Sequence, residues 1–422
     1  MKYKKTTLKN GLKVITVPMK DNPTVTVLVL VETGSNYETK QKNGLSHFLE
    51  HMCFKGTTKR PTAHMIASEL DALGSQYNAF TGQEYTGYYA KGDAKHFKDL
   101  FDIVSDIYLN STFPEVEMQK EKGVIVEEIN MYEDMPQRQV QDLFTSLLYG
   151  DQPAGWNIAG TRENVRAMTR QDFIEYHKEH YVPKATTVVI AGKVSEKMML
   201  AEARRVFGAL PKNKKSGMPK TVEKQTKPEI LIKHKVTDQT HFVLGFRTFN
   251  IFDKRNSALT VLGSVLSGGM SSRLFQKLRE DMGVAYYVRA HNDASIDHGF
   301  FEIAAGVANN RVEEVVTEIL KECKRLTTEL VDKKELSKVK EYLAGNMKLE
   351  LESSDAFAQF FGGQEVMKHK IESPEAIERK IRKVTALDIK HVASEIFKSN
   401  GLNLAIIGPF EDKTSFAKIL KI

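Results

Sequence analysis

Along the first half of the chain, the apolar residues follow two patterns in alternation, one typical of strands and one typical of helices. Runs rich in β-branched residues predict strands over Lys13–Val17 and Thr24–Val31. Apolar positions at helical spacing then predict an amphipathic helix over Asn43–Phe54. A second helix is expected over Thr62–Leu73, because Thr62 is a good N-cap and Gly74 is a typical stop signal. The chain therefore begins with strands that are followed by helices.

The alternation continues over the next hundred residues. A strand is expected near Thr86–Ala90, and two long helices are expected over Ala94–Leu109 and Glu115–Glu133. The β-branched run Thr186–Gly192 predicts another strand, and Ser195–Phe207 predicts the helix after it. Strands and helices that alternate in this way predict an α+β fold.

The second half of the chain repeats this order of elements. Its expected strands are His241–Phe246, Gly299–Gly306 and Asn403–Gly408, and its expected helices are Ala258–Leu266, Val312–Leu326 and Lys333–Leu351. A repeat of the same order at a period near 200 residues indicates a duplication. We therefore expect two homologous α/β-sandwich half-domains.

A segment with neither apolar periodicity nor bulk separates the two halves. It runs from Pro211 to Pro228 and reads PKNKKSGMPKTVEKQTKP. Such a composition is typical of an exposed linker. The expected organisation is an N-terminal domain over residues 1–210, a linker over 211–228 and a C-terminal domain over 229–422.

The amino-acid composition argues against several functional classes of protein. The 422 residues carry 61 basic and 54 acidic side chains, and this net charge of +7 is spread along the chain, so we expect no nucleic-acid partner. Two cysteines, Cys53 and Cys323, cannot form a disulfide framework. The longest apolar run, Thr24–Val31, is too short to span a membrane, so no membrane partner is expected. The N-terminal residues lack the apolar centre of a signal peptide, so we expect a cytoplasmic protein.

The stretch HFLEHMCFKGT, which begins at His47, carries the strongest chemical signal. In a helix, His47 and His51 are one turn apart and project from one face, so both imidazoles can bind one divalent ion. Glu50 lies between them in sequence, where a carboxylate can approach the same ion without binding it. That is the position from which a general base takes a proton from the attacking water molecule. The order H-x-x-E-H is the inverse of the commoner H-E-x-x-H.

A catalytic zinc ion usually has a third protein ligand. The predicted helix EKGVIVEEINMYED offers four acidic candidates: Glu121, Glu127, Glu128 and Glu133. Glu121 and Glu128 are seven residues apart and so share a face, whereas Glu127 points about 100° away from Glu128. Periodicity favours this pair and does not choose within it.

These segments, together with NAFTGQEYTGYYAKG, resemble the inverzincin metallopeptidases. This family includes pitrilysin, insulysin, the mitochondrial processing peptidase and smaller bacterial relatives, and the resemblance covers essentially the whole chain. It implies that His47, His51 and Glu128 bind one zinc ion per chain and that Glu50 is the base. It also implies that Glu121 supports the site without binding the metal.

The resemblance extends to residues that would bind the substrate. Asn78, Ala79 and Phe80 match the edge strand on which the family takes an extended peptide by β-addition. In LREDMGVAYYV, Arg279 and Tyr286 match a pair of donors that reaches the zinc from the opposite half-domain or subunit. Phe54 follows the zinc motif. It is either a wall of the pocket for the residue after the scissile bond or a core residue.

The expected function is therefore a zinc metalloendopeptidase that cleaves peptides and unfolded segments. In the processing-peptidase-like subfamily two chains pair around one chamber. This chain carries both the zinc motif and the Arg279/Tyr286 pair, so we expect a homodimer in a bacterial or archaeal cytoplasm. A heterodimer stays open, and two other classes are weighed against the peptidase: a non-catalytic structural subunit and a peptide-binding clamp. Preference for basic peptides is an implication of the family alone.

Two further features have competing interpretations. Cys53 departs from the aliphatic residue usual at its position, so it is either a small buried residue or an oxidation-sensitive thiol near the metal. We favour the first. His177 and His180, in EYHKEHYVP, have no acidic partner segment that resembles a site, so a solvated helix end is expected there.

Overall fold

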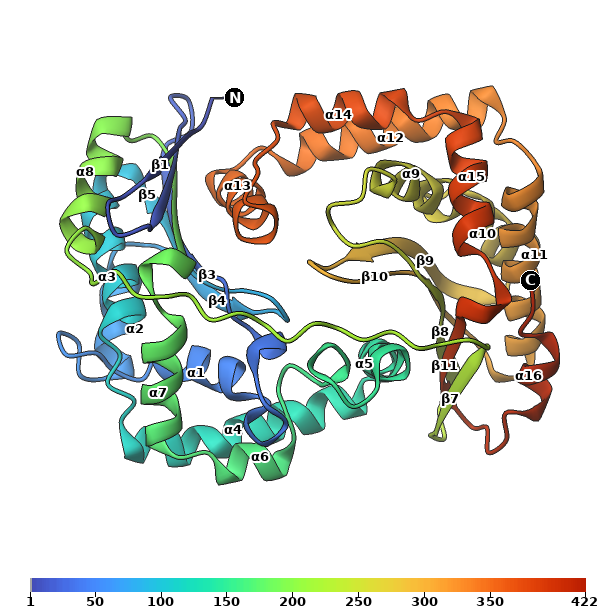
Figure 1. Cartoon of the computed structure of the whole chain (residues 1–422), viewed down its shortest axis with the longest axis horizontal. Coiled ribbons are helices and arrows are strands. Elements are labelled where there is room, and N and C mark those ends of the chain that lie inside the picture. Colours follow the sequence, from blue (N-terminus) through green and yellow to red (C-terminus); the bar gives the residue numbers. More distant parts are fainter. Residues whose placement is uncertain (1) are drawn as a thin grey trace. The chain divides into compact units, whose positions relative to one another are not determined.

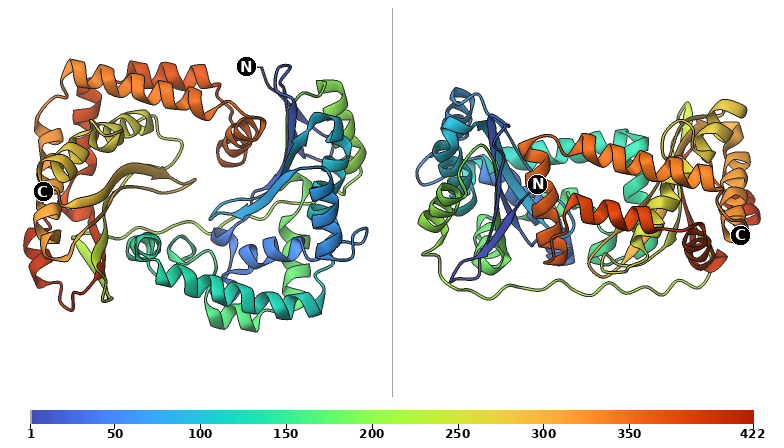
Figure 2. Two further views of the ribbon diagram at one scale, coloured as in Figure 1. Left: turned by 180° about the vertical axis from the view of Figure 1, so that it is seen from behind. Right: turned by 90° about the horizontal axis from the view of Figure 1, so that it is seen from above.

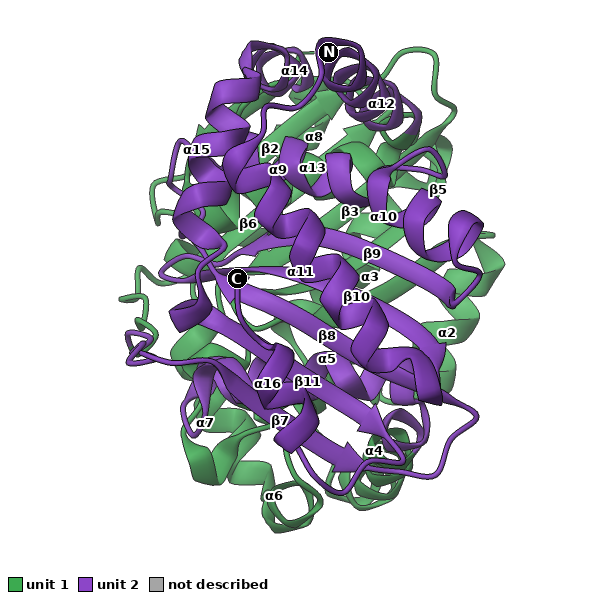
Figure 3. Cartoon of the chain, turned by 90° about the vertical axis from the view of Figure 1, so that its right-hand side faces the viewer, with its two compact units in different colours: residues 1–130, 156–219, 350–373 green, residues 131–155, 220–349, 374–422 purple. Residues whose placement is uncertain are grey.

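The computed structural model describes residues 2–422, which divide into two compact units (Figure 3). Unit 1 comprises the chain up to Asn130 together with Trp156–Pro219 and Glu350–Ser373. Unit 2 comprises Met131–Gly155, Lys220–Leu349 and Pro374–Ile422. Each unit therefore includes a segment from the other half of the sequence.

Unit 1 is built on a six-stranded mixed sheet (Figure 1). Its strands are β1 (Lys4–Thr7), β2 (Lys13–Pro18), β3 (Thr24–Val31), β4 (Gln76–Thr81), β5 (Thr86–Asp93) and β6 (Thr186–Gly192). They lie in the order β1-β2-β6-β3-β5-β4, and β2 and β6 are parallel while the other neighbours are antiparallel. β4 is therefore an edge strand.

Helices cover both faces of the unit 1 sheet. They are α1 (Leu45–Cys53), α2 (Ala63–Ala72), α3 (Phe97–Leu109), α4 (Glu115–Asp134), α6 (Arg162–Ala167), α7 (Arg170–His180), α8 (Glu196–Phe207) and α13 (Ser354–Lys368). The residues of β3 alternate between two cores, as a strand buried on both sides requires. Val27 and Val29 pack in the core that contains α1 and α3, whereas Leu28 and Leu30 pack against α13.

Unit 2 is built on a five-stranded sheet with the same strand order. Its strands are β7 (Glu229–His234), β8 (Gln239–Arg247), β9 (Ala285–Ala294), β10 (Gly299–Ala308) and β11 (Leu402–Gly408). The order β7-β11-β8-β10-β9 repeats β2-β6-β3-β5-β4, and β7 and β11 form the parallel pair that corresponds to β2 and β6. The expected α+β fold with a repeated order of elements is therefore confirmed.

Helices also cover both faces of the unit 2 sheet. They are α5 (Pro136–Tyr149), α9 (Asn256–Ser267), α10 (Arg273–Phe275), α11 (Val312–Thr328), α12 (Lys333–Glu350), α14 (Pro374–Lys383), α15 (Ala386–Ile396) and α16 (Thr414–Ile419), with a π-helical turn η6 (Gln276–Asp281) after α10. α9, α11, α15 and α16 contribute to the large core on one face. α5 packs on the other face against β8 and β11. Within residues 2–422, no helix is both long and apolar enough to cross a membrane.

The segment 211–228 has no regular secondary structure and is drawn as a long thread in Figure 2. Its residues are mostly exposed, but several of them are anchored. The Lys215 ammonium forms an ion pair with Glu32 of unit 1. The Thr221 backbone N–H donates to the Asp297 carboxylate of unit 2 over 2.7 Å. The segment is thus anchored at Lys215 and at Thr221 by carboxylates that follow the strands β3 and β9.

Candidate metal centre

The N-terminus of α1 is held by a buried carboxylate outside the helix. Gly44 precedes the helix with φ 99°, a conformation that favours glycine, and no side chain of its own caps the helix there. Instead, Glu38 accepts hydrogen bonds from the backbone N–H of Gly44 over 2.8 Å and of Ser46 over 2.6 Å. Burial raises the pKa of Glu38 to about 7, although these hydrogen bonds oppose the shift. The start of α1 is therefore fixed.

The two faces of α1 differ in chemistry. Phe48, Leu49 and Met52 are fully buried, and the Phe48 ring packs edge-to-face on Phe173 at 4.8 Å. His47 and His51 lie on another face, with their side chains 13% and 21% exposed. The apolar packing on one face thus holds the two imidazoles of the other in place.

His47, His51 and Glu128 form a group that could hold a metal ion, with their ligand atoms within 4.8 Å of one another. The Glu128 Oε2 atom lies 3.6 Å from the Nε2 atom of His47 and 3.6 Å from that of His51. Zinc ligands about 2.1 Å from a tetrahedral ion are separated by roughly 3.4 Å. Both the donor set and its spacing therefore fit a zinc ion.

Glu121 and Lys55 support this group from behind His51. The Glu121 side chain is 6% exposed; its Oε1 atom is 2.9 Å from His51 Nδ1, and its Oε2 atom is 2.6 Å from the Lys55 ammonium. Burial raises the pKa of Glu121, but its bonds to His51 and Lys55 outweigh burial, and the net shift is downward. An ionised Glu121 accepts from Nδ1–H, which leaves the Nε2 lone pair of His51 for a metal.

The two histidines differ in their affinity for protons. Burial and the charge of His51 lower the pKa of His47 to about 3, so this imidazole is neutral at pH 7. Burial also lowers the pKa of His51, but its bond to Glu121 and the charges of Glu50 and Glu128 outweigh burial and raise it. Metal binding needs neutral imidazoles, so an ion at this position competes with a proton more strongly at His51 than at His47.

Glu50 projects toward the edge strand β4. The Thr81 hydroxyl donates to Glu50 Oε2 over 2.7 Å. Burial raises the pKa of the Glu50 carboxyl, the Thr81 hydrogen bond and the charge of His51 lower it, and the charge of Glu128 raises it; the net shift is upward. A carboxylate with a raised pKa next to a metal group is well suited to accept a proton.

The other residues expected in unit 1 lie as follows. Asn78, Ala79 and Phe80 are on β4, which pairs antiparallel with β5 and has no second neighbour among the strands of residues 2–422. Phe54 is the C-cap of α1 and is half-buried, with its ring 6.4 Å from that of Tyr88. β4 therefore has the free edge that β-addition requires.

Arg279 and Tyr286 belong to unit 2 and lie close together. Arg279 is in the π-helical turn η6, and its guanidinium is 5.1 Å from the Phe275 ring. Its Nη1 atom donates to the Tyr286 carbonyl over 3.3 Å, and the Tyr286 side chain is 66% exposed near the start of β9. Single π turns occur often at functional sites.

Three contacts of this site were not expected from the sequence. Glu38, Lys55 and Thr81 each touch a residue of α1 or its support: Glu38 and Lys55 flank the helix in the sequence, whereas Thr81 comes from the distant strand β4. Strand alternation offered a signal for Thr81, since it shares a face of β4 with Ala79. Glu38 and Lys55 carry no comparable signal.

The other interpretations have clear outcomes. The interpretation of His177 and His180 as a solvated helix end is wrong: His180 is 5% exposed, and His177 Nε2 donates to the Tyr108 carbonyl over 2.9 Å. Tertiary packing of α7 buries His180 and partly buries His177, and this burial lowers the pKa of each imidazole. Cys53 is fully buried, and burial raises the pKa of its thiol to about 12, which confirms the small buried residue.

Comparisons with known proteins agree on one family. Residues 13–162 match the model described as insulinase (peptidase family M16), and residues 167–343 match the peptidase M16 inactive domain. The chain is 35% identical to the uncharacterized zinc protease YmxG of Bacillus subtilis, over 96% of this chain and 98% of that protein. It is 36% identical to an uncharacterized zinc protease of Rickettsia felis, over 95% and 96%.

Solved structures show the same fold. A protease from Helicobacter pylori superposes with a TM-score of 0.89 at 24% identity, over 97% of this chain and 99% of that chain. A peptidase M16 inactive domain from Pseudomonas fluorescens superposes with a TM-score of 0.90 at 18% identity, over the same shares. With the two relatives at 35% and 36% identity over nearly their whole length, the chain belongs to the insulinase family of peptidases, family M16.

Proposed function

We propose that the protein is a zinc metalloendopeptidase that hydrolyses peptides and unfolded segments in an enclosed chamber. The observation that carries this proposal is the group of two imidazoles and one carboxylate, in which Glu128 Oε2 lies 3.6 Å from the Nε2 atom of each histidine, close to the ligand spacing of a tetrahedral zinc site. Relatives of similar length carry the name zinc protease.

His47, His51 and Glu128 would hold the ion. When bound, zinc supplies a Lewis acid that polarises a water molecule and the scissile carbonyl. Glu50 accepts the proton of the attacking water and later returns a proton to the leaving amine. Glu121 fixes the ring of His51 through Nδ1.

The substrate would bind as an additional strand. The free edge of β4, at Asn78–Phe80, offers backbone N–H and C=O groups to an extended peptide. Arg279 and Tyr286 would donate to the substrate carbonyl as negative charge develops on it. Phe54 would line the pocket for the residue that follows the scissile bond.

The proposed assembly is a homodimer that encloses the chamber. One chain contains both the metal group and the Arg279/Tyr286 pair, so two copies supply two full sets of residues. An inactive partner chain is then not required.

Glu50→Gln is the variant that tests the proposal. Removing a general base is expected to lower the hydrolysis of a quenched peptide by about 10²–10⁴-fold. The zinc content is expected to stay unchanged, because Glu50 is not a ligand in this proposal. Glu127→Gln is the matched control, since it makes the same chemical change at an exposed position of the helix that carries Glu128. Cleavage rate and bound zinc are measured on the same samples.

Other results identify the rival functions. Unchanged hydrolysis by Glu50→Gln contradicts the assigned base. A metal-free and inactive wild type favours a structural subunit. A zinc-loaded wild type that binds peptides tightly without cleaving them favours a peptide clamp or points to a missing partner chain.

A further inference from the structure

A cavity of about 210 Å³ lies beneath α13, on the face of the unit 1 sheet that this helix covers. It is lined by Leu28, Leu30, Phe80, Tyr85, Gln359 and Gly363. The two leucines are 1% exposed and form an apolar floor, and the Phe80 and Tyr85 rings meet edge-to-face at 5.9 Å. Gln359 is exposed and supplies a polar group at the rim. The lining is therefore apolar and aromatic, with one polar side.

Two adjacent glycines of α13 explain why the cavity is open. At Gly362 the helix approaches the sheet so closely that a Cβ atom would lie 2.6 Å from Leu30 Cδ1. At Gly363, one residue further, the nearest atom to an added Cβ is Tyr85 Oη at 3.9 Å. Gly362 thus permits the close packing, whereas the absent side chain of Gly363 leaves the space unfilled. A residue larger than glycine at 363 would occupy the cavity without a backbone clash.

The cavity borders the strand that would bind the peptide. Successive side chains of a strand project to opposite faces. On β4, Thr81 bonds to Glu50 on the catalytic face, and its neighbour Phe80 projects to the α13 face and lines the cavity. In a peptide added to β4, the residue opposite Phe80 therefore projects toward the α13 face, within reach of the ring and the space beside it.

We propose that this cavity is a substrate subsite that takes one large apolar side chain of the cleaved peptide. The leucine floor and the aromatic walls of the cavity favour a Phe, Leu or Met side chain over Ala or a charged residue. The volume is below the 300–1,000 Å³ of sites for drug-sized ligands, so it suits a single side chain. Gly363 sets the depth of the subsite. This inference rests on the proposed peptidase function and adds a preference for the residue that faces α13.

The test compares two peptide series on wild type and Gly363→Leu. In each series a quenched peptide carries Phe or Ala at successive positions around the scissile bond. For wild type, kcat/KM is expected to favour Phe by about 10–200-fold at one position. For Gly363→Leu that preference is expected to fall at least tenfold, while cleavage of the Ala peptide stays within twofold. Gly345→Leu is the matched control, because Gly345 is a helical glycine of α12 with open space around an added Cβ.

Equilibrium binding separates failure of the subsite from failure of the peptidase proposal. The same peptides are titrated against Glu50→Gln and against Glu50→Gln combined with Gly363→Leu. Tighter binding of the Phe peptide that is lost in the double variant supports the subsite even if no peptide is cleaved. Equal binding and cleavage of Phe and Ala peptides at every position overturns it while the peptidase stands. Gly363→Ala is a milder substitution that favours the helix, and it is expected to lower the preference partially.

Discussion

At the scale of single residues, the metal group brings together side chains with opposite proton affinities. Burial and the charge of His51 keep His47 neutral, whereas a buried carboxylate and its ammonium partner orient His51 from behind. Glu50 is bonded to a threonine hydroxyl rather than to a cation, and its pKa is raised. The two carboxyls therefore differ in proton affinity: the pKa of Glu121 is lowered by His51 and Lys55, whereas that of Glu50 is raised, as the proposed roles of support and proton transfer need. This division is what a zinc peptidase requires of them.

A second buried carboxyl, in unit 2, makes the stability of the protein depend on pH. Glu302 on β10 is 2% exposed, and its Oε1 atom lies 3.3 Å from Nε2 of His291 on the neighbouring strand β9. Burial and the charge of Asp293 raise the pKa of Glu302 to about 8. The folded state therefore holds a proton that the unfolded chain releases near pH 4.5. Stability contributed by this proton is full below about pH 4.5 and is lost as the pH rises to about 8.

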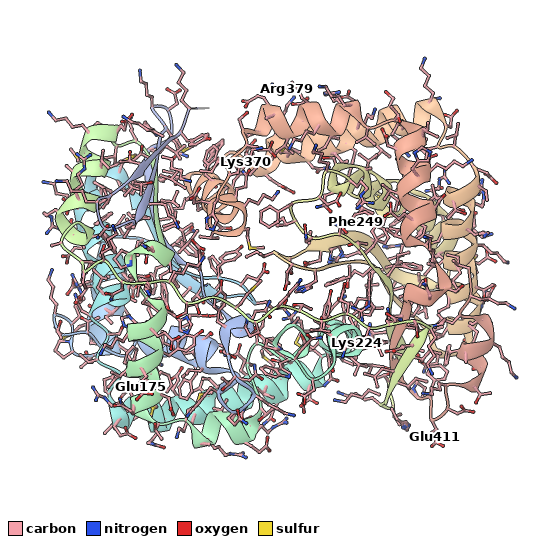
Figure 4. The ribbon with its side chains drawn as sticks, in the orientation of Figure 1. Glu175, Lys224, Phe249, Lys370, Arg379 and Glu411 are labelled. Atoms are coloured by element: carbon pink, nitrogen blue, oxygen red, sulfur yellow. The ribbon has the colours of Figure 1, made fainter. Side chains whose placement is uncertain are left out.

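The substitution Glu302→Gln is expected to abolish this loss of stability at higher pH, because glutamine stays neutral at every pH. The variant is expected to match wild type near pH 4.5 and to be more stable above it. The gain in free energy of unfolding should reach a few kcal/mol by pH 8 and then level off. Thermal melting at pH 5, 7 and 9 measures this difference. Glu411→Gln, at an exposed position between β11 and α16, is the control and should leave Tm unchanged (Figure 4). A variant that is less stable at pH 9 would contradict the burial argument.

At the scale of elements, two helices pack on sheets of the other sequence half. α13 follows α12 in the second half but covers β3 and β6 of unit 1, and α5 lies in the first half but covers β8 and β11 of unit 2. Fully buried aromatic residues fix both contacts, Phe361 in α13 and Phe144 in α5. Each sheet is thereby closed on its second face by a helix that is distant in sequence.

The sequence predicted the elements whose signals are local. The α2 helix begins after Thr62, whose side chain accepts from Met65 N–H, and α1 carries the expected H-x-x-E-H pattern. No local sequence pattern predicts which sheet α13 packs on, because an apolar helix face can pack against any apolar surface. The contact of Lys55 with Glu121 also depends on how α1 and α4 cross. Sequence patterns therefore identified the chemistry of the site, while its support depends on long-range packing.

Substitution of Phe361 and Phe144 tests whether α13 and α5 each stabilise the sheet of the other sequence half. Phe361→Ala removes a fully buried side chain and is expected to cost about 3–5 kcal/mol of unit 1 stability. Amide hydrogen exchange should then accelerate in α13, β3 and β6. Phe144→Ala is the reciprocal variant and should accelerate exchange in α5, β8 and β11 instead. If each variant loosened only the half of the sequence that contains it, the unit boundaries would be wrong.

At the scale of the whole molecule, a duplicated fold carries chemistry that is not duplicated. In unit 2, α9 follows β7 and β8, just as α1 follows β2 and β3 in unit 1. The two helices therefore occupy equivalent places in the order of elements. The sequence of α9, NSALTVLGSVLS, contains no His, Asp or Glu. Unit 2 has instead the Arg279 and Tyr286 pair near the start of β9. One copy of the fold therefore offers metal ligands, and the other offers hydrogen-bond donors.

This division predicts that zinc content and turnover can be separated by mutation. Arg279→Ala is expected to keep one zinc ion per chain and to lower kcat/KM by about 10²–10³-fold, because it removes a donor to the developing charge and leaves every ligand in place. His51→Gln is expected to lose both zinc and activity, since it removes a ligand. Lys277→Ala, a neighbouring change in η6, is the control for the turn itself. Zinc is measured by elemental analysis and turnover with a quenched peptide. Loss of zinc in Arg279→Ala would show that unit 2 supports the metal group rather than the substrate.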